Sequence, residues 1–113
     1  MEPDVHIAGE LEAWPTMSQM ARLLRDAGLA VSVGRYSLRL TDFDHFVFQE
    51  YGGDLGNPDV DFEADSLDDM LRDAGRVSLI LANADLRHRF EIYDDSHELV
   101  GYLHHDWPNQ HAN

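Results

Sequence analysis

The sequence predicts an α+β fold made of two similar units, each with one helix and several strands. The pentapeptide Leu-Arg-Asp-Ala-Gly occurs twice, at residues 24–28 and 71–75. Both copies are flanked by segments in which apolar and polar residues alternate, as is typical of half-buried strands. Residues 52–58 (GGDLGNP) are the strongest cluster of breaking residues. We therefore expect a single domain over residues 1–113, with modules at 4–51 and 59–104 joined by a linker at 52–58.

The first module is expected to contain a strand at 4–9, a helix at 17–27 and strands at 30–34, 36–41 and 46–51. The helix is indicated by an apolar stripe with i, i+3, i+4, i+7 spacing, formed by Met20, Leu23, Leu24 and Ala27. Thr16 and Gln19 fit a capping box at its start. Gly28 fits the left-handed residue that ends a helix.

The second module is expected to repeat this order, with a strand at 59–64, a helix at 66–74 and strands at 77–82, 88–93 and 98–104. Its helix shows the same stripe, formed by Leu67, Met70, Leu71 and Ala74. Asp65 and Ser66 can cap its start, and Gly75 is expected to end it. Five extra residues at 83–87 are read as a longer loop.

Composition excludes several classes of function. The chain has 22 Asp and Glu residues against 8 Arg and no Lys, so its net charge of -14 argues against binding nucleic acid or membranes. The absence of cysteine excludes disulfides and thiolate chemistry. No basic, apolar leader or long apolar run is present, so we expect a cytoplasmic protein. The acidity itself has two explanations. The first is general: solubility, base composition or salt adaptation. The second is functional: attraction of a cationic ligand or a basic protein.

Short motifs in the second half resemble the glyoxalase/bleomycin-resistance/extradiol-dioxygenase superfamily, the vicinal oxygen chelate proteins. They lie at residues 59–68, 73–75 and 89–95. The resemblance implies two tandem βαβββ modules that form a curved, mainly antiparallel sheet with helices on its convex face. It also implies a homodimer.

The same resemblance puts the superfamily's metal ligands at Asp4, Gln49, Asp59 and Gly101. Glycine has no side-chain ligand and glutamine is a weak one, so we expect no metal and no other cofactor. The chain would then be a divergent member without glyoxalase or dioxygenase chemistry. Tail residues 103–111 offer three His and one Asp, which are either transition-metal ligands or part of a frayed terminus.

Strand alternation predicts which side chains face the helices and which face outward. The inward set is Val5, Ile7, Leu38, Leu40, Phe46, Phe48, Val60, Phe62, Phe90, Ile92, Val100 and Tyr102. The outward set contains Leu99, Leu103 and every candidate ligand-binding residue except Trp107. These candidates are His6, Arg39, Gln49, Tyr51, Asp59, Asp61, Glu63, Arg89, Glu91, Tyr93 and, in the tail, Trp107.

Two functions from different classes fit this surface. The first is a non-catalytic small-molecule binder of the drug-sequestering, bleomycin-resistance type, with carboxylates that attract a cationic aromatic ligand and aromatic residues that stack on it. The alternative is an acidic interaction protein of the immunity type, which masks a basic partner. A catalytic reading would use His6 and Glu91 as acid and base, but no catalytic residue is assigned.

Overall fold

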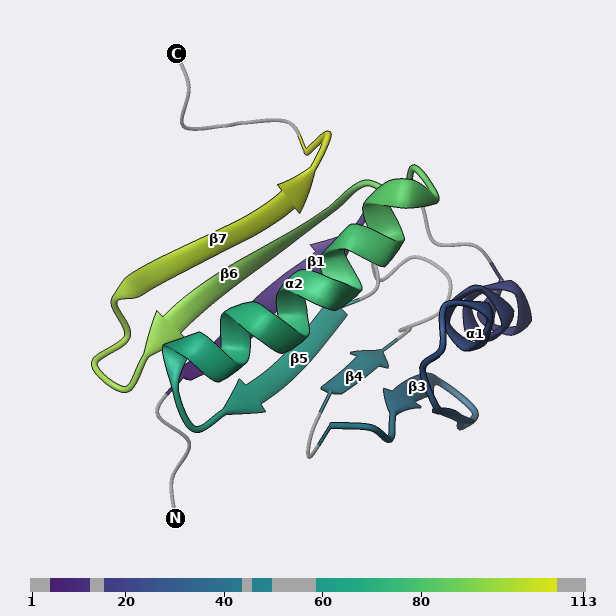
Figure 1. Cartoon of the computed structure of the whole chain (residues 1–113), viewed down its shortest axis with the longest axis horizontal. Coiled ribbons are helices and arrows are strands. Elements are labelled where there is room, and N and C mark those ends of the chain that lie inside the picture. Colours follow the sequence, from purple (N-terminus) through teal and green to yellow (C-terminus); the bar gives the residue numbers. More distant parts are fainter. Residues whose placement is uncertain (1–4, 13–15, 44–45, 50–58, 108–113) are drawn as a thin grey trace.

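The computed structural model describes residues 5–12, 16–43, 46–49 and 59–107, and the α+β class is confirmed (Figure 1). In chain order the described elements are β1 (Val5–Leu11), α1 (Met17–Asp26), β2 (Val31–Val33), β3 (Ser37–Leu40), β4 (Phe46–Gln49), β5 (Asp59–Ala64), α2 (Leu67–Asn83), β6 (His88–Asp94) and β7 (Leu99–His105). The described strands form one open sheet of order β2-β3-β4-β5-β1-β6-β7, and all neighbours are antiparallel. The expected linker at 52–58 lies outside the described residues.

β1 is an interior strand of the sheet, between two strands from the second half of the chain. Ile7 of β1 is opposite Phe62 of β5 on one side and Ile92 of β6 on the other. β5 in turn pairs with β4 of the first half, where Phe62 is opposite Phe46. The two halves therefore interlock, and neither forms a separate sheet.

The first helix follows the sequence prediction closely. The Thr16 hydroxyl accepts a hydrogen bond from the Gln19 amide, and the Gln19 side chain accepts one from the Thr16 amide, so the capping box is confirmed. At the other end Gly28 has a φ of +96°. The Gly28 amide donates to the Arg25 carbonyl and the Leu29 amide donates to the Leu24 carbonyl. This is a Schellman motif, which requires the left-handed backbone that glycine adopts freely.

The second helix is longer than predicted, and the strand expected at 77–82 is wrong. α2 continues through Gly75 to Asn83, with Ser66 as its N-cap. The physical reason is that Val77 and Leu81 extend the buried stripe begun by Met70 and Ala74. The second half thus contains a strand, a helix and two strands, and the tandem βαβββ duplication is not confirmed.

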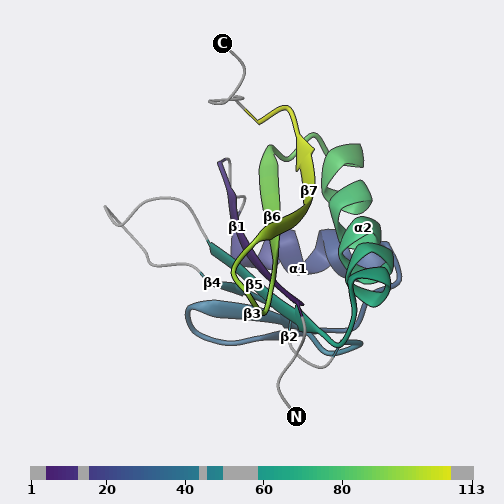
Figure 2. The same ribbon diagram turned by 90° about the vertical axis from the view of Figure 1, so that its left-hand side faces the viewer.

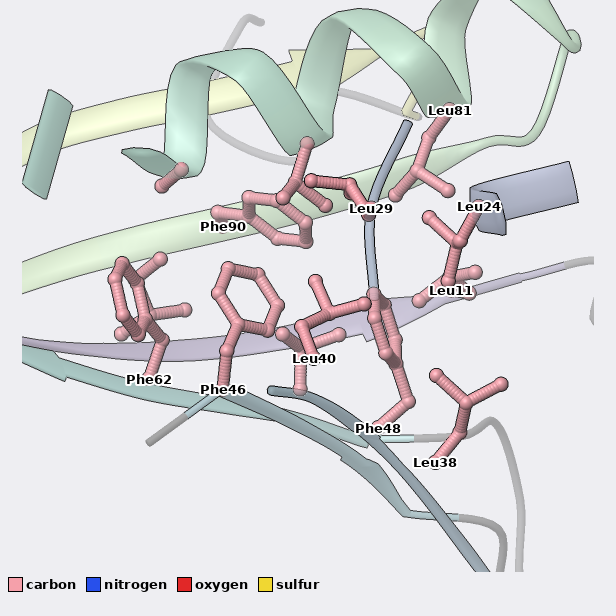
Figure 3. Close-up of a cluster of buried hydrophobic side chains, with 14 of the residues drawn as sticks. Leu11, Leu24, Leu29, Leu38, Leu40, Phe46, Phe48, Phe62, Leu81 and Phe90 are labelled. Atoms are coloured by element: carbon pink, nitrogen blue, oxygen red, sulfur yellow. The ribbon is translucent and has the colours of Figure 1, made fainter. Parts of the chain in front are cut away.

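Both helices pack on the same face of the sheet and enclose one hydrophobic core. Figure 2 shows α2 standing to one side of β1, β6 and β7, and Figure 3 shows side chains of the core between α2 and the strands. Phe46, Phe62 and Phe90 are fully or almost fully buried there, and the rings of Phe46 and Phe62 are 4.5 Å apart. The predicted placement of the helices on a convex face is not confirmed.

The inward set is confirmed for β1, β3, β4, β5 and β6, but it is wrong for β7. Tyr102 is opposite Glu91 on the outward face and is 43% exposed, and Val100 is 37% exposed. Leu103 instead is opposite Phe90 and packs against the core. Apolar residues occupy successive positions along β7, so alternation alone does not select the inward face. A bulge between β6 and β7 interrupts the regular pairing as well.

Candidate functional site

The face of the sheet opposite the helices, here called the open face, is polar over its central strands. β1 presents His6, Ala8 and Glu10 on this face, and they alternate with inward positions that include the buried Val5, Ile7 and Leu11. The residues opposite them on β5 are Glu63, Asp61 and Asp59, and those on β6 are Tyr93, Glu91 and Arg89. The antiparallel register therefore brings side chains from distant parts of the sequence into one surface.

A pocket of about 500 Å³ opens on this face over β4, β5, β1 and β6. This volume is within the range of small-molecule sites, roughly 300–1,000 Å³. The lining residues are His6, Ile7, Ala8, Gly9, Glu10, Gln49, Asp59, Val60, Asp61, Arg89 and Glu91. Four carboxylates and one guanidinium are thus the charged groups among the described lining residues.

Ala8 lies at the middle of this pocket, with a carboxylate on each side. Asp61 of β5 and Glu91 of β6 are both opposite Ala8 in the sheet. Because adjacent strands are about 4.8 Å apart, these two positions are separated by roughly 10 Å. The Ala8 methyl group fills little of this width. A small cation placed over Ala8 would therefore have a carboxylate on either side.

The guanidinium of Arg89 is already engaged by neighbouring groups. Its Nη2 and Nε atoms donate to Glu10 Oε1 at 2.6 and 3.1 Å. Its Nη1 atom lies 3.8 Å from Glu91 Oε1, and its Cζ atom lies 5.4 Å from the centre of the Trp107 ring. Arg89 therefore offsets part of the acidic charge and joins β1 to the residues that follow β7.

Aromatic groups adjoin the pocket next to His6. The His6 ring stacks on Tyr93 at 5.8 Å, and His97 meets His6 edge-on at 6.1 Å. Partial burial, together with the Glu91 carboxylate, raises the pKa of the Tyr93 phenol. The raised pKa keeps the phenol in its neutral form beside the Glu91 carboxylate.

The structure brings six of the eleven candidate residues into this pocket: His6, Gln49, Asp59, Asp61, Arg89 and Glu91. Glu63, Arg39 and Tyr93 lie on the same face but do not line the pocket. Trp107 is beside it, against Arg89. Tyr51 lies outside the described residues.

Five lining residues were not among the candidates: Ile7, Ala8, Gly9, Glu10 and Val60. Of these, Ala8 and Glu10 alternate with His6 along β1 and so belong to the outward set. The expected first strand ended at residue 9, whereas β1 continues to Leu11. Extending the alternation that includes His6 by two steps would have found both residues.

Of the four positions that the resemblance marks as metal ligands, the three that the structure describes do not come together. Gln49 and Asp59 are opposite each other on β4 and β5. Gly101, however, is opposite Ile92, and a Cβ atom on it would lie 3.0 Å from Ile92 Cδ1 on the core side. Asp4 lies outside the described residues. Across the ranges that the structure describes, no three His, Asp or Glu side chains are grouped to hold a metal ion.

The histidines at the start of the tail belong to a strand. His104 and His105 are in β7, where His104 stacks on Tyr102 at 4.8 Å. His105 Nε2 lies 2.9 Å from Asp85 Oδ1, beyond the end of α2. Neither the frayed-terminus reading nor the metal reading describes these two residues.

Comparisons with family models, curated proteins and solved structures found no match to this chain. The resemblance to the vicinal oxygen chelate superfamily therefore stays a prediction from short motifs. In the described part of the chain, neither helix is long and apolar enough to cross a membrane.

Proposed function

We propose that this protein is a non-catalytic binder of a small cationic organic molecule, of the drug-sequestering type. The observation that carries the proposal is the hollow over Ala8, which has Asp61 and Glu91 on its two sides. An ammonium, amidinium or guanidinium group would occupy this hollow. The flat aromatic part of such a ligand would lie toward the stacked rings of His6 and Tyr93.

Charge supports this choice of ligand. Glu10, Asp59, Asp61 and Glu91 line the pocket, while the pairing with Glu10 already compensates Arg89. The chain as a whole carries a net charge of -14, so its field attracts cations and repels anions. Within a concave site the same charges act through less water than on a flat surface, which strengthens their attraction for a bound cation.

The first experiment is a thermal-shift panel followed by calorimetry on the responding compounds. The panel contains aromatic monocations and dications, bleomycin-type glycopeptides, aliphatic amines, and anionic analogues of matched size. We expect the aromatic cations to raise Tm and the anions to leave it unchanged. At a ligand concentration one hundred times Kd, the stabilisation is about 2.7 kcal/mol. Failure of every cation in the panel to bind would contradict the proposal.

A pair of variants tests whether bound cations use this pocket. Asp61→Asn removes one carboxylate beside Ala8, and Asp95→Asn removes one from the exposed turn after β6. Both variants lower the negative charge of the chain by the same amount. We expect only Asp61→Asn to weaken binding, by about tenfold, if the lost attraction is near 1.4 kcal/mol. Equal weakening by the two variants would instead indicate a general effect of net charge.

The open face also favours a second function, an immunity-type protein that masks a basic partner. A Lys or Arg side chain of another protein carries the same cationic group as the proposed ligand, and the described helices all lie on the other face. Complex formation between the purified protein and a basic protein captured from its host would favour this function. The basic protein should bind Asp95→Asn but not Asp61→Asn. The small cations of the thermal-shift panel should leave Tm unchanged.

A further inference from the structure

The two edges of the sheet differ in length and in protection. β2 has only three residues, Val31–Val33, and is followed directly by Gly34 and Arg35. β7 has seven residues, Leu99–His105, and among the described strands it pairs with β6 alone. Short strands, charged side chains, proline and bulges are the usual protection of a sheet edge against pairing with another chain. The bulge in β7 lies near its start, and Gly101–His105 pair regularly with β6. β7 contains no Asp, Glu, Arg, Lys or Pro.

Apolar side chains are exposed along β7. Leu99 is 56% exposed, and Val100 and Tyr102 are exposed by about two fifths of their surface. α2 packs on β7, and its Leu71 is 40% exposed.

The flank of α2 on which Leu71 lies follows from helical geometry. Leu71 is two turns before Ser78, so the two residues lie on the same side of the helix. The Ser78 hydroxyl bonds to His88 of β6, which is opposite His105 of β7. Leu71 therefore lies on the flank of α2 that faces β6 and β7. We call the combination of Leu71, Leu99, Val100 and Tyr102 the β7 edge.

Charge identifies which partner this edge fits. With a net charge of -14, two copies of the chain repel each other over most surfaces. The β7 edge carries no carboxylate, so two copies can meet there without like charges between the paired strands. A basic partner, by contrast, would find no acidic group within this strand to pair with.

We propose that the β7 edge binds a second copy of this chain, with the two β7 strands antiparallel about a twofold axis normal to the sheet. Such an interface is isologous and closes at two copies, because each β7 edge is covered by the other. The backbone groups of β7 that face away from β6 gain hydrogen-bond partners. The dimer leaves the pocket over β4, β5, β1 and β6 uncovered, so this inference is independent of the proposed ligand.

Sedimentation velocity over a concentration series tests the proposal. We expect the wild-type mass to double with concentration. Val100→Asp, which adds a negative charge to the paired strand of each copy, should stay monomeric. Ser32→Asp introduces the same charge at the exposed β2 edge and should still dimerise. Circular dichroism melts of both variants establish that they are folded, and Tyr102→Asp replaces Val100→Asp if that variant is not.

Hydrogen exchange gives a second readout that needs no variant. Amides of β7 should exchange more slowly as protein concentration rises, whereas amides of β2 should not change. A wild-type protein that stays monomeric would overturn the proposal. So would a dimer that Val100→Asp and Tyr102→Asp leave intact, or protection of β7 only when a strand from a different protein is added.

Discussion

The hydroxyl of Ser78 on α2 and Nε2 of His88 on β6 lie 2.7 Å apart in the interior of the protein. His88 is completely buried, and its Nδ1 atom lies 2.8 Å from the Leu86 carbonyl oxygen. Because a carbonyl only accepts, Nδ1 carries the proton and Nε2 accepts from the Ser78 hydroxyl. The histidine is thus a neutral member of the core with both nitrogens satisfied.

Acidification should destabilise the protein through His88. Burial lowers the pKa of this imidazole below its ordinary value of 6.5, and the neighbouring His105 and His104 act in the same direction while the Leu86 carbonyl opposes them. Above pH 6.5 both the folded and the unfolded states are neutral at this residue. Below it, only the unfolded chain takes up the proton until the lower folded pKa is reached. As the pH is lowered below 6.5, the free energy of unfolding should therefore decrease by up to about 1.4 kcal/mol per pH unit.

Urea unfolding between pH 8 and pH 5 measures this slope. His88→Gln removes the buried imidazole and should flatten the pH dependence. His97→Asn removes an exposed imidazole from the turn between β6 and β7 and separates the effect of burial from the loss of a histidine, and asparagine tolerates the φ of 65° at this position. Identical pH dependence in wild type and His88→Gln would refute this role of His88.

Alanine at the two glycines of the repeated pentapeptide should change stability in opposite directions. Gly28 has a φ of +96°, so Gly28→Ala forces a side chain into the left-handed region and should cost about 1–2 kcal/mol. Gly75 is inside α2, and a Cβ atom there would have no neighbour within 4 Å. Gly75→Ala should therefore stabilise by about 0.5–1 kcal/mol. Thermal unfolding of the two variants checks both signs, and a loss of stability in Gly75→Ala would show that the helix does not run through this residue.

The two copies of the pentapeptide also show how far the sequence could predict the fold. Helix starts were predictable because Thr16 and Ser66 act on neighbouring residues within one turn. The end of α2 was not, because an apolar run such as residues 77–82 fits either a buried strand or a buried helix. The choice depended on Val77 and Leu81 packing in the core, which is tertiary information.

The open face was predicted in part for a similar reason. Alternation within β5 and β6 placed Asp61 and Glu91 outward correctly. Alternation could not show that Ala8 separates them, because that depends on β1 pairing with strands more than 45 residues away in sequence. The face of β7 was mispredicted because its apolar residues occupy both odd-numbered and even-numbered positions, which point to opposite faces of the sheet.

A methyl group at Gly9 should destabilise the centre of the sheet. A Cβ atom at this position would lie 2.6 Å from the Arg89 carbonyl oxygen and 2.9 Å from Phe90 Cδ1. The backbone of β6 would have to move, so Gly9→Ala should cost about 1–3 kcal/mol. Gly101→Ala is the matched control in the edge strand, since its closest contact is the end of the Ile92 side chain. Denaturant unfolding should rank Gly9→Ala well below Gly101→Ala in stability, and the reverse order would contradict the close approach of β1 to β6.

A larger residue at position 8 should close the proposed pocket without changing any charge. Ala8 is exposed, so Ala8→Leu fills the space between Asp61 and Glu91 and should leave the fold intact. We expect binding of the responding cations to weaken by at least tenfold, measured by calorimetry. Ala30→Leu, at an exposed position outside the pocket lining, should bind as wild type does. Undiminished binding to Ala8→Leu would place the ligand elsewhere on the molecule.

The position of β1 between β5 and β6 also constrains how the chain folds as it is synthesised. Val5–Leu11 emerges from the ribosome early, yet its partners are Asp59–Ala64 and His88–Asp94. Translation at about 5–20 residues per second leaves β1 without sheet neighbours for several seconds. Its apolar Val5, Ile7 and Leu11 must avoid other contacts during that time. The nascent chain is therefore most exposed to misassociation before β5 is made, and cotranslational chaperones would act on β1 rather than on the later strands.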